Sequence, residues 1–586
     1  MAAMRSQLLF RAVATILPAL VFCASLVGSD SAFAQVVLQR GNTADPGTID
    51  PQRANGQWEN HIISDMFVGL STYDVKGNSI YGAAESHTVS PDGLVWTFKI
   101  RKDHKWSDGA PVTADDFVYA YRRINDPATK AEYAAITYMI KNAQAANSGA
   151  MPGEAIGARA IDAETLEITL EHPTPYFFQA LSHYCFYPVP KHVVEKYGDR
   201  WTDKDKMVSN GAYMLVDRVD NDYVHVKKNP YFYDAADVQI DEVYYKPVAG
   251  AAAVKRFRAA ELDINNDFPL PELETLKRTL PEETKVSPFI LTQYVAFNMT
   301  HPPFDNKDVR LALGMAIDRE TVTDKVLKGG QVPAYGLVPP GISGYPGDAF
   351  VPYKDVPIEE RRQKARDLLA SAGFGPDNPL KATYIFQSTS VEAKLVAVTL
   401  QDMWRRVGAE IQLQSAESKV HYANLRRQNY DIGWGGWIAD FNDARNYLFL
   451  AETSAEDMNY TKYSNPNFDQ LLVESDMTVD AAKRQQIMKE AEQMMLNDSP
   501  MAPVYFGTSR NLVHSWVKGW EPNPVDVHRT RWMRIEGSRQ AVAMNDDAAP
   551  GAIPDGAEVQ TGEEQSWSSW FSGVTCSWFG IWCAAT

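Results

Sequence analysis

The chain has 586 residues, of which 45% are hydrophobic and 22% are charged, and its formal net charge is −17. This length exceeds what one hydrophobic core supports, so the sequence predicts two to four domains of ordinary globular protein. The negative charge argues against nucleic acid as a partner, because phosphate binding requires a basic surface.

The first 34 residues have the pattern of a secretory signal. Arg5 and Arg11 give a positively charged start, and the apolar run that follows is too short and too interrupted by proline for an ordinary membrane-spanning helix. Residues 32–34, Ala-Phe-Ala, form a small-x-small cleavage sequence. We therefore expect cleavage after Ala34 and export, with a bacterial periplasm as the simplest destination.

Between the signal and residue 287 the sequence predicts a mixed α+β lobe at about 58–190 and then, from about 191, mainly strands separated by turns. A Pro-Asp-Gly turn at 91–93 leads into LVWTFKI, where apolar residues alternate with others as in a half-buried strand. Thr113 and Asp116 form a capping box at the start of a helix. Cys185 stands among aromatic residues and is expected to be an inert buried thiol.

From residue 288 to 508 strands and helices alternate. Helices are predicted for DVRLALGMAIDRETVTDKVLKGG and RRQKARDLLASAG, and then come ATYIF, EAKLVAVTLQDMWRRVG, EIQLQSA, SKVHYANLRRQ and YDIGWGGW as strand, helix, strand, helix and strand. This alternation predicts parallel strands joined by crossover helices. Ligands in such sheets bind outside the carboxyl ends of the strands.

The C-terminal part differs in composition from the rest. Residues 538–566 are rich in Ala, Gly, Pro, Asp and Glu without periodicity, which predicts a disordered linker. Residues 567–586 hold four tryptophans together with Cys576 and Cys583, and a disulfide between these cysteines would close a small loop. This Trp-rich tail is either a membrane-surface contact or docking segment, or a disordered stretch without such a role.

Residues 430–441, YDIGWGGWIADF, are the stretch to which we assign the binding site. Trp434 and Trp437 belong to an apolar strand that contains three glycines, and glycines in a strand suggest that something approaches its backbone closely. An extended peptide could pair with this backbone as an added strand, with the Trp rings beside its side chains. Asp440 follows the strand and could hold the ammonium group of such a peptide.

The alternative for Asp440 is a structural role. It stands directly before NDARNYLFL, which predicts a helix, so its carboxylate could simply cap that helix. The spacing alone does not decide between the two roles.

Common motifs for catalysis and for metal binding are absent from the sequence. There is no GxxxxGK[ST], HExxH or GxSxG pattern, and the 11 histidines include no close pair at metal-ligand spacing. Acidic pairs such as Asp115 and Asp116 stand where a helix start explains them. We therefore expect a binding protein that is not an enzyme and holds no metal and no cofactor.

A long series of motifs, beginning with AAESHTVSPDGLVWTFKIRKDHKWSDGAPVTADDFVYAYRRINDP at 83–127, carries a family resemblance. It continues through HPTPYFFQAL, YPVPKHVVEKYGDRW, SNGAYML, PPFDNKDVRLALGMAIDRE, GWIADF, YSNPNFDQLL and PMAPVYF. These motifs resemble the bacterial extracellular solute-binding family that includes the oligopeptide- and dipeptide-binding proteins. The resemblance covers about 36–537 and is greatest to the oligopeptide-binding branch.

The resemblance implies an α/β, bilobal periplasmic-binding-protein fold that is similar to the type II class, with an extra α+β domain inserted in the first lobe. The first lobe would combine 36–57, 191–287 and 509–537, with 58–190 as the insert. The second lobe would be 288–508. The two lobes would close over the ligand about a hinge.

The function implied by the resemblance is that of a periplasmic substrate-binding protein of an ABC transporter. It would be a monomer that captures oligopeptides through their backbones and delivers them to the permease and ATPase subunits in the inner membrane. The alternatives are a murein-type peptide or a non-peptide solute such as a sugar, an opine or a nickel complex. An exported peptidase using the same cleft is disfavoured, because the sequence shows no nucleophile–base or metal signature.

The resemblance also implies roles for particular residues. Asp440, in the GW-x-AD motif, would hold the ammonium group of the peptide, and the strand residues before it would pair with the peptide backbone. The positions that the resemblance assigns to the site are Asp45, Tyr133, Trp434, Gly435, Gly436, Trp437, Asp440 and Asn459. We add Arg426 to the predicted site as a substitute for a cation that relatives carry elsewhere.

Three departures from the family pattern affect the ligand. Relatives often carry a cation where this chain has Trp434 and Gly314, and those cations can meet the C-terminal carboxylate of a peptide. Arg426 or the arginine after it could substitute. A Cys pair of some relatives is replaced by the apolar pair Leu291 and Ile438. We therefore expect the N-terminal anchor to be kept and the C-terminal anchor to differ, which suits a ligand with a modified or distant C-terminus.

Overall fold

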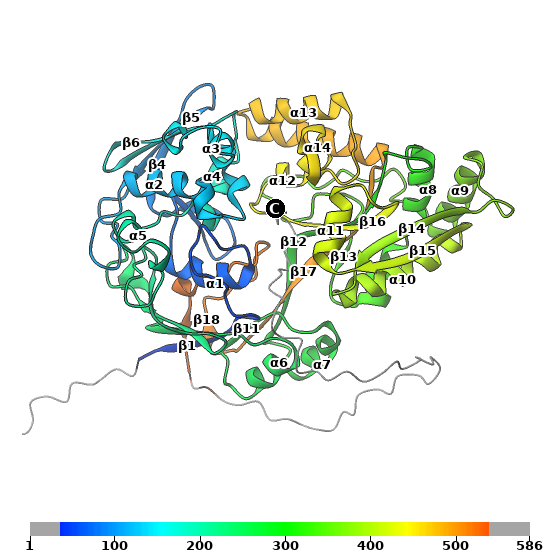
Figure 1. The fold of residues 1–586 in the computed structure, drawn as a ribbon. Coiled ribbons are helices and arrows are strands. Elements are labelled where there is room, and N and C mark those ends of the chain that lie inside the picture. The colour runs from blue at the N-terminus through cyan, green and yellow to red at the C-terminus, as the bar shows by residue number, and fades with distance from the viewer. Residues whose placement is uncertain (1–34, 538, 540–586) are drawn as a thin grey trace, which may run out of the picture. The chain divides into compact units, whose positions relative to one another are not determined.

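The computed structural model describes residues 35–537 and residue 539 (Figure 1). The predicted signal, the linker apart from Arg539, and the Trp-rich tail with its two cysteines lie outside the described residues. Cys185 is buried and makes no disulfide, as predicted.

One mixed sheet of eleven strands runs through the described residues. Its order is β15-β14-β16-β12-β17-β11-β1-β10-β9-β8, with β13 beside β17. The strands are β1 (Val37–Gly41), β8 (Tyr213–Val219), β9 (Tyr223–Lys228), β10 (Glu242–Lys246), β11 (Ile264–Asn266), β12 (Thr284–Phe297), β13 (Val332–Pro333), β14 (Leu380–Gln387), β15 (Ala409–Ala416), β16 (Ile432–Ile438) and β17 (Met501–Val513).

The pairing within this sheet is only partly parallel. β14 is parallel to β15 and to β16, which confirms the prediction from the alternating strands and helices. β12 is antiparallel to both β16 and β17. Leu291 lies opposite Ile438 in the β12–β16 register, so the apolar pair that replaces the cysteines of relatives is a pair of cross-strand neighbours.

Residues 58–190 contain a second, antiparallel sheet, in keeping with the mixed α+β composition predicted for them. Its order is β4 (Ala84–Val89), β5 (Val95–Ile100), β7 (Thr165–Thr169) and β6 (Ala158–Asp162), and β2 (Ser71–Tyr73) pairs with β3 (Ser79–Tyr81) nearby in sequence. The helix α2 (Ala114–Ile124) begins with the predicted capping box of Thr113 and Asp116.

The remaining α-helices of the described residues are of two lengths. The long ones are α1 (Gln57–Met66), α6 (Gly250–Arg258), α8 (Lys307–Ala316), α9 (Ile358–Ser371), α10 (Val391–Arg405), α11 (Ser418–Arg426), α13 (Pro466–Met477) and α14 (Ala481–Asp498). The short ones are α3 (Ala143–Asn147), α4 (Phe177–Ala180), α5 (Lys191–Tyr197), α7 (Leu273–Thr279) and α12 (Arg445–Leu448).

The single helix predicted from DVRLALGMAIDRETVTDKVLKGG is wrong, because α8 ends at Ala316 and a π-helical stretch, Thr321–Leu327, follows. The interruption lets Arg319 turn inward, where its guanidinium is fully buried and donates to the carbonyls of Ala334 (2.7 Å) and Pro503 (2.8 Å). Burying a charged group requires such hydrogen bonds, and a continuous helix would not supply them.

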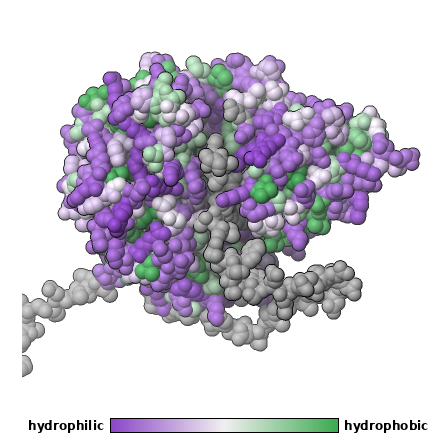
Figure 2. Space-filling model, viewed as in Figure 1, coloured by the Kyte–Doolittle hydropathy of each residue, from purple (hydrophilic) through white to green (hydrophobic). Residues whose placement is uncertain are grey.

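On the face shown in Figure 2, hydrophilic residues predominate and hydrophobic residues form small, scattered groups. Among the described helices, none has both the length and the apolar composition needed to span a bilayer.

Candidate functional site

The β16 strand has one backbone edge that its neighbour leaves uncovered. β12 pairs with β16 along its whole length, whereas β14 pairs only with its first two residues. Ala439 donates its N–H to the carbonyl of Ile290 on β12, and alternate residues of a strand point their backbone groups to opposite edges. Gly436 and Ile438 therefore direct their N–H and C=O groups toward the uncovered edge.

Trp434 closes the far end of this edge. Its carbonyl lies 2.8 Å from Nε2 of His421, which donates to it from α11. Its ring is buried and lies 6.0 Å, between centroids, from the ring of Tyr505. The open part of the edge is thus the segment around Gly436 and Ile438, next to Asp440.

Packing within the sheet accounts for the glycines of β16. A side chain at Gly435 would place its Cβ 2.5 Å from the ring of Tyr294, and one at Gly436 would place it 2.5 Å from the amide of Gln293. Tyr294 and Gln293 belong to β12 and cover these glycines. The close approach that these glycines suggested is therefore made by side chains of β12, and a ligand would reach β16 along its edge.

The Asp440 carboxylate accepts a hydrogen bond from the phenolic O–H of Tyr133. The backbone N–H of Asp440 donates to Oδ1 of Asn446 (3.1 Å), which also accepts from Nε1 of Trp437 (2.8 Å) and so fixes the turn after β16. The N–H at the start of α12 is bound by Asp443 instead (2.9 Å). The capping alternative for Asp440 is therefore wrong.

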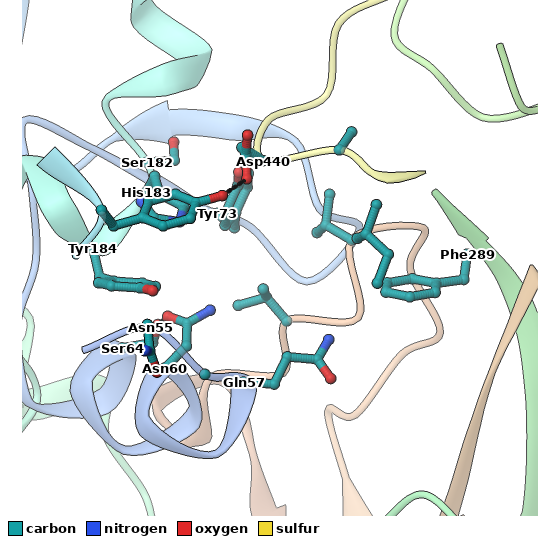
Figure 3. A pocket seen from close by; sticks show the side chains of 16 residues that line it. Asn55, Gln57, Asn60, Ser64, Tyr73, Ser182, His183, Tyr184, Phe289 and Asp440 are labelled. Atoms are coloured by element: carbon teal, nitrogen blue, oxygen red, sulfur yellow. Dashed lines mark hydrogen bonds between the residues drawn. The ribbon is translucent and has the colours of Figure 1, made fainter. Parts of the chain in front are cut away.

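Asp440 lines a cavity of about 80 Å³, which we call the first cavity (Figure 3). Asp440 is the only carboxylate among its described lining residues, and they include no lysine or arginine. Burial raises the pKa of Asp440 from its ordinary value to about 6, although hydrogen bonds with Tyr133 and Asn446 lower it. A carboxylate enclosed without a cation is an arrangement that the ammonium group of a ligand would complete.

His183 does not supply the missing cation. Its ring stacks on that of Tyr133, with centroids 5.3 Å apart, and it is enclosed in the same cavity. Burial lowers the pKa of His183 to about 3, so the imidazole is neutral at physiological pH. Its role is to support the ring that donates to Asp440.

The wall opposite Asp440 comes from α1 and the residues just before it, which the sequence analysis missed. Figure 3 shows Asn55, Asn60 and Ser64 facing Asp440 across the first cavity, with Gln57 beside them. Ser64 donates its O–H to Oδ1 of Asn60 (2.7 Å). Polar residues at helical spacing are equally typical of a solvated face, so the sequence offered no specific signal for this wall.

Three of the predicted site residues lie neither on β16 nor in the described lining of the first cavity. Asp45 is 3.7 Å from Nη2 of Arg218. Asn459 is buried and donates to the carbonyl of Tyr463 (2.7 Å) within its own loop. Arg426 is the last residue of α11. Burial raises the pKa of the Tyr422 hydroxyl on the same helix, and the positive charge of Arg426 lowers it. Their roles toward a ligand stay predictions.

The part of the chain that the structure describes contains no candidate metal site. No group of three or more His, Cys, Asp or Glu side chains is placed there to hold an ion.

Sequence comparison relates the chain to transport proteins. The family model of bacterial extracellular solute-binding proteins, family 5 Middle, matches residues 79–459. The chain is 36% identical over 505 residues to the periplasmic oligopeptide-binding protein OppA of Escherichia coli K12, a match that covers 85% of this chain and 92% of OppA.

Two solved structures share the fold. The unliganded open form of the periplasmic murein tripeptide-binding protein MppA gives a TM-score of 0.77 at 34% identity and covers 86% of this chain and 98% of MppA. Haemophilus influenzae OppA in complex with the peptide RPPGFSPFR gives a TM-score of 0.71 at 32% identity, with 86% and 99% covered. The predicted α/β, bilobal periplasmic-binding-protein fold is confirmed.

Proposed function

Because the chain belongs to the bacterial extracellular solute-binding proteins of family 5, we propose that it binds oligopeptides in the periplasm and delivers them to an ABC importer. The observation that carries the proposal is the Asp440 carboxylate, enclosed at the end of the open β16 edge in a cavity whose described lining has no cation. An extended peptide offers both missing partners, an ammonium group and a backbone that can pair with a strand edge.

In this binding mode Asp440 holds the ammonium group, and Gly436 and Ile438 pair with the peptide backbone. An ammonium and a carboxylate about 4 Å apart attract by roughly 4 kcal/mol at an effective dielectric constant of about 20. Desolvation of both charges offsets part of this energy. Backbone pairing does not depend on side-chain identity, so many peptide sequences can be accepted.

Delivery of a peptide to the importer requires that peptide binding change the conformation of the protein. In this proposal the first lobe (36–57, 191–287 and 509–537), with its insert 58–190, closes against the second lobe (288–508). The ligand favours the closed form only as far as it binds that form better. The exported monomer, cleaved after Ala34, then meets the permease and ATPase subunits, and the peptide is released chemically unchanged. The relatives' names, a periplasmic oligopeptide-binding protein and an OppA in complex with a peptide, support the binding of peptides in the periplasm.

The test compares tri-alanine with N-acetyl-tri-alanine by isothermal titration calorimetry. Acetylation, or Asp440→Asn, should weaken binding by about 2–5 kcal/mol, because either change removes one partner of an enclosed charge pair. Glu410→Gln, at an exposed carboxylate on β15, is the matched control and should not change the affinity. Equal binding of the free and acetylated peptides would refute the role of Asp440.

A murein-type peptide is the second candidate ligand, and the far end of β16 favours it. Trp434 is buried beneath Tyr505, and a side chain at Gly314 would meet the phenolic oxygen of Tyr353, so neither position carries a cation for a peptide C-terminus. MppA, with the same fold, is named for a murein tripeptide. Native mass spectrometry of the purified protein distinguishes the candidates, because a murein peptide gives one defined mass and mixed oligopeptides give a ladder.

A further inference from the structure

A second cavity lies on the other side of the hydrogen bond between Asp440 and Tyr133. It measures about 320 Å³ and shares only these two residues with the described lining of the first cavity. Trp437 lines the second cavity, and Ile438 lines the first. Consecutive residues of a strand point to opposite faces, so the two cavities lie on opposite faces of β16.

This geometry divides the side chains of a bound peptide between the two cavities. A peptide added to the β16 edge is itself a strand, and its first two side chains therefore point to opposite faces of the sheet. With the ammonium group at Asp440, one of these two side chains falls on the face of Trp437. The second cavity is positioned to receive it.

The second cavity has an apolar wall. Met139, Trp437, Phe449 and Met458 contribute side chains to it, and Phe449 packs edge-on against Trp437 with ring centroids 5.1 Å apart. Such a wall suits the aliphatic stem of a long side chain.

The opposite side of the second cavity carries a surplus of negative charge. Arg445 donates to Oε2 of Glu452 (2.8 Å) and to Oδ2 of Asp476 (3.2 Å), so two carboxylates share one guanidinium. Oδ1 of Asp476 is buried and has no hydrogen-bond partner. Arg445 and Glu452 line the cavity, as does Asp440. With Asp440 paired to the N-terminal ammonium group of the peptide, Arg445, Glu452 and Asp476 together keep one negative charge.

We propose that the second cavity is a subsite for a side chain that ends in a primary ammonium group, as in lysine, at the first or second residue of the peptide. The inference rests on the proposed function and adds a side-chain class to it. The aliphatic stem lies along Trp437 and Met458, and the ammonium group reaches the carboxylate of Glu452. An acidic side chain is disfavoured there, because Arg445 is already shared by two carboxylates.

The test uses four tripeptides with free N-termini: Lys-Ala-Ala, norleucine-Ala-Ala, Ala-Lys-Ala and Ala-norleucine-Ala. Norleucine keeps the aliphatic stem and lacks the ammonium group, so the affinity ratio of the lysine to the norleucine peptide isolates the charge. At one position this ratio should be about tenfold, and at the other it should be close to one, because only one of the two side chains reaches the second cavity.

Two variants test whether the affinity ratio of the lysine to the norleucine peptide depends on the second cavity. Glu452→Gln keeps an acceptor for Arg445 and should bring the ratio close to one, whereas Glu410→Gln, the exposed control on β15, should leave it unchanged. Ser454→Lys places a tethered ammonium group at the exposed mouth of the cavity and should also abolish the preference. The ratio within one variant is insensitive to a uniform loss of affinity, and thermal unfolding confirms that each variant is folded.

The outcomes separate this inference from the proposed function. Ratios near one at both positions, or a lysine preference that survives Glu452→Gln and Ser454→Lys, would overturn the subsite while tri-alanine still bound. If neither tri-alanine nor any of the four peptides binds, the proposed function and the subsite are both wrong.

Discussion

Asp440 and Asp443 stand three residues apart in the loop between β16 and α12, and their surroundings are opposite. Both oxygens of Asp443 accept from Arg484, at 2.7 and 2.9 Å, in a buried bidentate pair. The Asp440 carboxylate has the neutral phenol of Tyr133 as its donor. Asp443 is therefore paired with Arg484, which is always charged, whereas Asp440 is enclosed without a cation as its partner.

The difference separates a structural role from a binding role. A buried charge is costly unless it is paired, so a carboxylate that holds the fold together needs its cation within the chain. A carboxylate that binds an ammonium ligand must keep its charge available until the ligand arrives. The raised pKa of Asp440 reflects that cost in the unliganded protein.

The largest expected effect comes from breaking the structural pair. Arg484→Ala leaves Asp443 buried and unpaired, and it should lower the free energy of unfolding by about 3–5 kcal/mol. Urea denaturation measures the loss. Arg405→Ala, which breaks an exposed pair with Asp402, is the matched control and should cost far less. Equal losses in the two variants would contradict the structural role of the Asp443–Arg484 pair.

Asp440→Asn should have the opposite effect on stability. The variant removes a charge that is enclosed without a cation, so the free energy of unfolding of the unliganded protein should rise at pH 7. One pKa unit corresponds to about 1.4 kcal/mol, and the pKa of about 6 therefore limits the gain to about 3 kcal/mol. Urea denaturation in the absence of peptide checks this, and a loss of stability would mean that Asp440 is a structural residue like Asp443.

The affinity for peptides with a free N-terminus should depend on pH. The ammonium group requires ionised Asp440, whose pKa in the unliganded protein is about 6, so the affinity should be highest between about pH 6 and 8. Below about pH 6 it should fall up to tenfold for each pH unit. Calorimetry between pH 4.5 and 8 measures the profile, and Asp440→Asn should flatten its acidic side. An acidic side that persists in this variant would assign the titration to another group.

The same raised pKa has a separate consequence for folding. The folded, unliganded protein binds a proton at Asp440 between the unfolded-state value near 3.8 and the folded value near 6. The stabilising contribution of this proton is complete below the lower value and is lost as the pH rises through the higher one. Asp440→Asn should remove this component from the pH dependence of unfolding.

We expect the smallest of these effects from Tyr133→Phe, which tests how far the Tyr133 hydroxyl helps to keep Asp440 ionised. The variant removes the hydroxyl that donates to Asp440, and this hydrogen bond lowers the pKa of the carboxylate. The pKa of Asp440 should therefore rise, and peptide affinity at pH 7 should fall by about 0.5–1.5 kcal/mol. Calorimetry at pH 7 and at pH 8 measures the loss, which should be smaller at pH 8. A loss that is equal at both values would mean that the hydroxyl acts without changing the pKa of Asp440, and no loss would mean that Tyr133 acts by packing alone.

Some of the site follows from the local sequence. The apolar run of 430–441 specified β16, and the position of Asp440 at its carboxyl end identified one end of the site, because strand periodicity is a property of neighbouring residues. The capping box of Thr113 and Asp116 is local in the same sense. The helix predicted across Arg319 was wrong, because the carbonyls that this arginine binds come from distant segments.

Local sequence patterns were enough to predict the strand, the carboxylate and the family pattern that surrounds them. Only the packing of the folded chain shows that Tyr133, 307 residues away, donates to Asp440, that Tyr294 fills the space beside Gly435, and that β14 stops short of Asp440. Elements distant in sequence pack together to supply these contacts, and no local pattern encodes them. A carboxylate is assigned to structure or to binding by whether that packing brings it a cation, as it does for Asp443 and does not for Asp440.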